Sequence, residues 1–389
     1  MTVLLDLGDI PVIDNHCHAI QAADYPDPAQ WRQLFTESPD ELMRTTHSAD
    51  TAFYRRLIRA MADFHGVHRT EAEVLAARAR LSPEQLVSAL FSDAKIGGVV
   101  IDTGYPAPES ALSHEAFTAA SGAGHVALQR LELTFQDLVA EHARYDDLVE
   151  ALRHELADVR AAGFAGFKTI AAYRTGLDIR RWPDDEARAS FARARNEVAA
   201  SGSVRLGHKP LLDTLLHVAF EAAAEQRLPV QFHVGYGDPD ADLRRAAPLE
   251  LRAVFENRAY RSMDIVLLHG CWPYFREGAY LASVYGNVYL DLSYAIPFLS
   301  VTELTTMTRA ALAIAPFGKL MYSSDGARVP ELHWIGARDG RRALGTVLSE
   351  LVEHDDLEPD EARDAGERIL NGTAHRLYGF AIACHRTPS

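Results

Sequence analysis

Pro11-Val12-Ile13-Asp14-Asn15-His16-Cys17-His18 is an apolar run that leads directly into two histidines separated by one residue. The run predicts a buried β-strand, on which successive side chains point to opposite faces. His16 and His18 therefore share one face, and Cys17 points away from it. Two neutral imidazoles on one face can bind one divalent metal ion. A His-x-His pair alone is more often coincidence, so its weight depends on where the later histidines and acids fall.

The composition excludes several classes of protein. Of the 389 residues 48% are hydrophobic, which is enough to form a large core. The formal net charge of -15 argues against nucleic acid or an anionic membrane as partner, because both require basic patches. Cys17, Cys271 and Cys384 are too widely spaced for a disulfide framework or a zinc ribbon. With neither a basic leader nor an apolar run of membrane-spanning length, we expect a cytoplasmic globular protein.

Short apolar runs alternate with helical stretches along the chain. This alternation predicts βαβ units with parallel strands. About eight strands favour closure into a barrel over an open doubly wound sheet, so the expected class is an α/β (β/α)8 TIM barrel. The expected strands are residues 11–18, 97–102, 128–133, 166–170, 229–234, 264–269, 288–292 and 319–324, and the expected helices include 114–122, 148–162, 184–200 and 210–226.

The segment after the first strand has a different character. Residues 20–95 contain helix-like stretches at 50–64 and 70–80, and Ser82-Pro83 is typical of a further helix start. An insertion at this place usually forms a lid over the end of the strand. Because the chain shows no repeat or linker, we expect residues 1–389 to form a single barrel domain. Residues 20–95 would be its helical insertion or lid, and helices would close the C-terminus.

Side chains able to bind a metal stand at the ends of several predicted strands. In an α/β barrel these ends meet at one mouth, where active sites are built. Each residue alone could be structural: a core histidine, a turn aspartate or a lysine that reaches water. Their joint occurrence in barrel order favours one site. They are His16 and His18 on the first strand, Lys168 on the fourth, His233 on the fifth, His269 on the sixth and Asp325 after the eighth.

This order of residues resembles the amidohydrolase superfamily of metal-dependent TIM barrels. The tail Asn-Gly-Thr-Ala-His-Arg-Leu-Tyr-Gly at 371–379 is similar to the closing helix of its amidohydrolase-related branch, which also contains non-oxidative decarboxylases. The passage Gly-Phe-Lys-Thr-Ile-Ala-Ala-Tyr-Arg-Thr-Gly-Leu at 166–177 resembles the amidohydrolase-like half of nodulin/FluG-type proteins. The glutamine-synthetase-like half of those proteins has no counterpart in these residues.

The chemistry of the side chains indicates their roles. His16, His18 and His233 offer nitrogen ligands and Asp325 an oxygen ligand, a set that suits Zn²⁺, with Mn²⁺ or Fe²⁺ as alternatives. Such a metal polarises a carbonyl and activates water. Asp325 can take a proton from that water and deliver it to a leaving amine. His269 either binds a second metal or stabilises the developing oxyanion.

Lys168 separates a one-metal from a two-metal site. A protonated amine repels a cation, whereas a lysine carbamylated by CO₂ bridges two metals in the binuclear members of the superfamily. An unmodified Lys168 could instead bind a substrate carboxylate. We favour one metal with Lys168 unmodified, and keep two metals with a carbamylated Lys168 as the alternative.

Substrate contacts are expected from the loops beyond the strand ends. The candidates are Tyr173, Arg174, Tyr236 and Arg328, although an arginine in such a loop can also be a solvated surface residue. We expect a metal-dependent hydrolase that cleaves an amide or other C–N bond of a small, carboxylated metabolite, and that forms a homo-oligomer. The alternatives are a non-oxidative decarboxylase or lyase on the same site, and a non-catalytic binding barrel.

Overall fold

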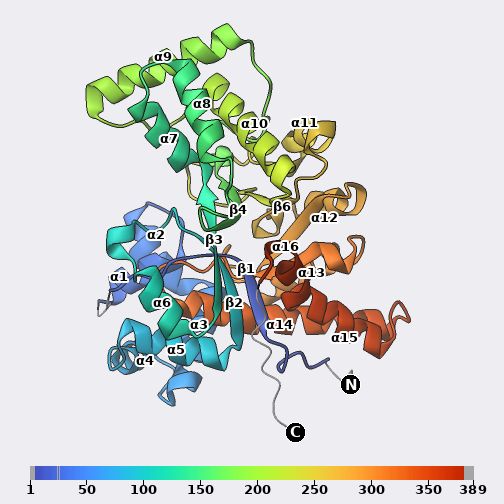
Figure 1. Ribbon diagram of the computed structural model, residues 1–389. Helices are drawn as coiled ribbons and strands as arrows, with labels where there is room; N and C mark the ends of the chain where they lie inside the picture. Colours follow the sequence, from blue (N-terminus) through green and yellow to red (C-terminus); the bar gives the residue numbers. More distant parts are fainter. Residues whose placement is uncertain (1–4, 24, 26, 381–389) are drawn as a thin grey trace.

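The computed structural model describes residues 5–23, 25 and 27–380, so Cys384 lies outside the described residues. Figure 1 shows strands gathered at the centre with helices around them. Among the described helices, none combines the length and the apolar character that crossing a bilayer requires.

Eight parallel strands form one sheet, in which each strand pairs with the next along the chain. Beyond the last strand the chain returns to the first: the Asp325 N–H donates to the His16 carbonyl at 3.0 Å, and the His18 N–H to the Gly326 carbonyl at 2.8 Å. The expected (β/α)8 TIM barrel is therefore confirmed. The strands are β1 (Val12–His18), β2 (Ile96–Asp102), β3 (Gly124–Arg130), β4 (Phe164–Thr169), β5 (Val230–Phe232), β6 (Ile265–Leu267), β7 (Val288–Ser293) and β8 (Leu320–Ser323).

Helices fill every connection between strands. In Figure 1, α7 to α10 form an upper lobe, and the helices between β1 and β2 lie on the opposite side of the barrel. The helices are α1 (Pro28–Arg32), α2 (Glu41–Thr45), α3 (Ala52–His65), α4 (Glu71–Arg78) and α5 (Pro83–Asp93) after β1; α6 (His114–Ser121); α7 (Leu131–Glu141) and α8 (Tyr145–Glu155); α9 (Asp184–Ser201) and α10 (Lys209–Gln226); α11 (Arg252–Phe255); α12 (Phe275–Val284); α13 (Val301–Leu312); and α14 (Pro330–Glu353), α15 (Pro359–Glu367) and α16 (Thr373–Tyr378) after β8.

Two of the expected elements are wrong in part. The third strand ends at Arg130 and not at residue 133, because Leu131, Phe135 and Val139 are buried at helical spacing and begin α7. The helix expected over 148–162 ends at Glu155. The side chain of Gln226 on α10 binds the Leu156 carbonyl at 2.7 Å and the Val159 N–H at 3.0 Å. Contacts from a distant helix therefore replace the helical hydrogen bonds there, and residues 156–163 form turns.

The C-terminal helix covers the end of the barrel at which the strands begin. Tyr378 on α16 packs among apolar side chains contributed by every strand except β5. Its hydroxyl donates to the Asn15 side chain at 2.9 Å and accepts from Gln231 at 2.8 Å. Asn15 in turn donates to the Asp291 carboxylate at 3.2 Å. The barrel floor is thus held by a hydrogen-bonded chain that links β1, β5, β7 and the tail.

The helices inserted after β1 are anchored on α14. Arg78 at the end of α4 donates to Glu331 at 2.6 Å, and both side chains are buried. The Arg78 guanidinium also lies over the Trp31 ring, at 4.8 Å from its centroid. A second ion pair joins Arg56 on α3 to Asp339 at 2.7 Å. One buried and one partly buried ion pair therefore hold the insertion against α14, beside the barrel.

The Arg78–Glu331 pair gives a test of this anchoring. Arg78→Met leaves a buried carboxylate without its cation, which should lower the free energy of unfolding by about 3–5 kcal/mol. Combining it with Glu331→Leu removes both charges and should recover most of that loss. The exposed pair of Arg55 and Asp50 is the control, because Arg55→Met should change stability by less than about 1 kcal/mol. Denaturant unfolding measures all three variants, and equal losses for the two arginine variants would contradict the anchoring.

Candidate active site

Asp325 lies against both histidines of β1. One of its carboxylate oxygens, Oδ1, is 3.3 Å from Nε2 of His16 and 3.5 Å from Nε2 of His18. The two imidazole rings stand edge to face, with centroids 4.9 Å apart. The pair at the end of β1 therefore meets the residue that follows β8, as the order of strands in the barrel requires.

His269 and His233 continue the cluster on its other side. Nδ1 of His269 is 3.1 Å from Oδ2 of Asp325, and Nε2 of the same ring is 2.8 Å from Nδ1 of His233. His269 thus lies between Asp325 and His233. Asp325 (φ 53°) and His269 (φ 62°) both adopt the left-handed backbone region, which non-glycine residues enter at an energetic cost. This turn of the backbone at each strand end brings the two side chains to the barrel axis.

Lys168 reaches the same point from β4. Its Nζ lies 3.2 Å from Nε2 of His16, and the side chain is buried. Burial lowers the pKa of the Lys168 amine to about 8, although the nearby charge of Asp102 opposes this shift. Among the described residues Lys168 forms no ion pair with a carboxylate, so its amine is directed at the centre of the site.

The pKa shifts of the cluster residues favour protonation states that can bind a cation. Burial, reinforced by the charge of Lys168, lowers the pKa of His16 to about 3. Burial and His269 hold the pKa of His233 well below its usual value. Burial opposes ionisation of Asp325, but His269 and hydrogen bonds from the neighbouring imidazoles hold its carboxyl pKa well below the ordinary range. Neutral imidazoles beside an ionised carboxylate are the ligands that divalent metals such as Zn²⁺ prefer.

Unsatisfied nitrogen atoms support this interpretation. His16 Nδ1 and His233 Nε2 are buried without a hydrogen-bond partner among the described residues. Donor atoms of His16, His269 and Asp325 lie within 4.8 Å of one another. The residues present therefore fit a metal ion, which His16, His18 and Asp325 would hold together with His233 or His269.

Asp14 holds the turn that carries Asp325. Its carboxylate accepts the Ser324 N–H at 2.8 Å and also the Ser324 hydroxyl. The Ser324 hydroxyl in turn accepts the Gly326 N–H at 2.8 Å. A buried acid on β1 thus fixes the residues on both sides of Asp325.

Sequence reasoning missed a buried ion pair next to His18. Arg130 at the end of β3 donates to Asp102 at the end of β2, with Nε to Oδ1 at 3.0 Å. Asp102 Oδ2 is 3.9 Å from His18 Nδ1. Burial opposes ionisation of Asp102, but Arg130 holds the pKa of its carboxyl well below the usual value. Asp102 ends an expected strand, so the strand-end argument would have identified it, whereas Arg130 lay inside the expected third strand at 128–133.

A cavity of about 270 Å³ opens above the cluster. Tyr173, Arg174, Tyr236 and Arg328 all line it, as do most of the cluster residues. The Tyr173 ring packs on the His233 ring at a centroid distance of 4.2 Å. The insertion contributes Leu34, Thr36 and Glu37 to the wall; Glu37 sits in an irregular segment where no pattern in the sequence pointed to it.

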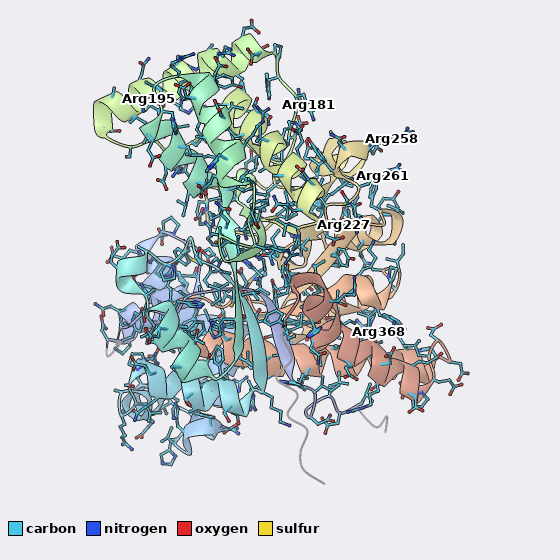
Figure 2. The ribbon with its side chains drawn as sticks, viewed as in Figure 1. Arg181, Arg195, Arg227, Arg258, Arg261 and Arg368 are labelled. Atoms are coloured by element: carbon cyan, nitrogen blue, oxygen red, sulfur yellow. The ribbon has the colours of Figure 1, made fainter. Side chains whose placement is uncertain are left out.

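The arginines of the cavity fall into two groups. Arg130 is paired with Asp102, and Arg205 with Asp240 at 2.7 Å. Arg174 and Arg328 pair with no carboxylate in the part of the chain that the structure describes, and Nε of Arg174 is buried without a partner. The six arginines labelled in Figure 2 lie on outer helices and loops, and none of these six lines the cavity. Two unpaired guanidinium groups therefore face the space above the cluster.

Comparison with known proteins agrees with this geometry. The family model described as amidohydrolase matches residues 142–380, which include Lys168, His233, His269 and Asp325; His16 and His18 lie outside the match. The protein fluG of Emericella nidulans is 36% identical over 221 residues, which are 55% of this chain and 25% of fluG. The chain thus matches about a quarter of the length of that relative.

Two solved structures resemble the whole chain. A proposed metal-dependent hydrolase of Lactobacillus casei ATCC 334 superposes with a TM-score of 0.86 at 27% identity, covering 97% of this chain and 98% of the other. Uronate isomerase of Thermotoga maritima superposes with a TM-score of 0.66 at 14% identity and covers 95% of each chain, which shows a shared fold. The matched family model spans more than half of the sequence, and the chain belongs to the amidohydrolase family.

Proposed function

We propose that the protein is a metal-dependent hydrolase that cleaves an amide or other C–N bond of a small carboxylated compound. The observation that supports this best is the Asp325 carboxylate, which lies within 3.5 Å of nitrogen atoms from three imidazoles beneath a cavity. His16, His18, His233 and Asp325 would hold one Zn²⁺, or Mn²⁺ or Fe²⁺ in its place. When bound, such an ion supplies Lewis-acid activation of a carbonyl and of water.

The residues of the chain have separate tasks in this proposal. Asp325 accepts a proton from the attacking water and passes it to the leaving nitrogen, since its carboxylate stays ionised at neutral pH. His269, in contact with Asp325, keeps the carboxylate oriented and lies on the cavity wall, where it can stabilise charge on the substrate oxygen. Lys168 stays unmodified and directs its amine at a substrate oxygen; carbamylation of Lys168, with two metals, is the alternative.

The cavity favours an acidic substrate. Arg174 has no carboxylate partner in the described chain, and burial lowers the pKa of its guanidinium. A substrate carboxylate would supply the missing partner through paired hydrogen bonds. The Arg174 guanidinium could also bind a substrate carboxylate that is then lost as CO₂. Release of CO₂ from a substrate without release of an amine would therefore identify a decarboxylase instead of a hydrolase.

His16→Ala and Asp325→Asn should each abolish metal-dependent turnover while leaving the fold intact, because each removes a donor at the centre of the cluster. Chelator treatment of the wild-type protein should have the same effect, and added Zn²⁺ should reverse it. Activity is measured on a panel of small amides, and folding by circular dichroism. His354→Ala is the control, since His354 is exposed at the end of α14 and does not line the cavity. Normal turnover in either site variant would refute the assignment.

Asp14→Ala should weaken metal binding about 10- to 100-fold, because the turn that carries Asp325 loses its anchor. Competition with a chromophoric chelator measures the affinity. Asp9→Ala is the matched control on the same segment, since Asp9 is exposed and pairs with the exposed Arg363. An unchanged affinity in Asp14→Ala would show that the turn holds Asp325 without this carboxylate.

Arg174→Gln should raise KM about 10- to 100-fold for a carboxylated substrate, since a hydrogen bond between charged groups contributes about 1.5–3 kcal/mol. The effect should vanish for an analogue in which the carboxylate is a primary amide. Arg205→Gln is the matched control, because Arg205 lines the same cavity but already binds Asp240. Equal effects of both variants on both substrates would argue against a carboxylate contact at Arg174.

A further inference from the structure

Glu37 is an acid of the inserted segment that reaches the catalytic cavity. It follows a short helical turn at Gln33–Phe35 and lines the same space as Asp325 and Arg328. Its side chain forms neither a hydrogen bond nor an ion pair with any residue that the structure describes. Burial raises the pKa of its carboxyl, and the charge of Arg328 opposes that rise. A partly buried acid without a partner, directed into a cavity, is an unusual arrangement that a ligand can complete.

Arg328 lines the same cavity as Glu37, yet no ion pair joins the two side chains. Among the cations that act on Glu37, Arg328 is the strongest. The Arg328 guanidinium instead donates to the Tyr105 hydroxyl and lies over the Tyr105 ring, at 5.1 Å from its centroid. Both contacts with Tyr105 orient the guanidinium in the cavity wall. A carboxyl group and a guanidinium group therefore line one cavity without forming an ion pair with each other.

This arrangement selects for a ligand that carries both charges. A free α-amino acid group presents an ammonium and a carboxylate on one carbon, and it can satisfy the acid and the arginine together. A dicarboxylate without an amino group can pair with Arg328 but is repelled by Glu37. An amine without a carboxylate can pair with Glu37 but is repelled by Arg328. Arg174 follows β4, which stands opposite β8 in the barrel, so it stays available for a second acidic group.

We propose that Glu37 and Arg328 form a subsite for a free α-amino-carboxylate group, so that the substrate is an amide of an amino acid. The identity of the cleaved bond rests on the proposed function. The binding of the α-amino-carboxylate group does not depend on it. Glu37 binds the ammonium, and Arg328 binds the carboxylate next to it. The metal-binding cluster then faces an amide formed by the side chain of the amino acid.

The test is equilibrium binding by calorimetry to the metal-loaded protein, with L-glutamate, N-acetyl-L-glutamate and glutarate as probes. The wild type should bind L-glutamate at least about tenfold more tightly than either of the other two probes. Glu37→Gln should abolish this preference and leave glutarate binding unchanged or stronger. Arg328→Gln should weaken the binding of all three probes. Glu41→Gln is the matched control, since Glu41 is an exposed glutamate on the same insertion, outside the cavity.

Three results would overturn the subsite: equal wild-type affinities for the three probes, no measurable binding of L-glutamate, or a preference for L-glutamate that persists in Glu37→Gln. None of these measurements requires turnover. A protein that prefers L-glutamate but cleaves no amide would keep the subsite and lose the hydrolase assignment. A protein that hydrolyses amides with no preference for a free amino group would keep the hydrolase assignment and lose the subsite.

Discussion

The seam between β1 and β8 is the constraint on which the site depends. The Asp325 N–H binds the His16 carbonyl at 3.0 Å, and the Asp14 carboxylate holds the Ser324 N–H at 2.8 Å. These bonds join the two ends of the chain of strands, and they place the Asp325 carboxylate against the histidines of the first strand. The hydrogen bonds that close the barrel therefore also bring the candidate metal ligands together, so we expect damage to the seam to affect both.

The sequence predicts the parts of this protein that follow from periodicity and strand order. Eight apolar runs implied the barrel, and strand ends implied that His16 and Asp325 would meet. Where other elements decide the structure, the sequence was insufficient: Gln226 ends α8 early, and buried Leu131 starts a helix inside an expected strand. Glu37 was missed because only the fold of the insertion brings it into the cavity. The roles of the site residues themselves stay predictions.

Two sets of side chains line the cavity, and they come from different parts of the fold. Side chains that can bind a metal stand on or directly after the strands, where the barrel fixes their positions. The side chains proposed to contact the substrate come from loops and from the insertion. Arg78 and Arg56 anchor that insertion on α14. Loops and insertions tolerate changes of sequence better than barrel strands do. Under the proposed function, this division would allow the substrate to change without disturbing the cluster at the strand ends.

The central claim is that Asp325 and the imidazoles around it hold a divalent metal ion. Anomalous diffraction from crystals grown with Zn²⁺ and measured at the zinc absorption edge tests this most directly. The account predicts an anomalous peak at about 2.0–2.2 Å from nitrogen atoms of His16 and His18 and from a carboxylate oxygen of Asp325. Zinc bound only at other places on the protein, with these three side chains free, would contradict it.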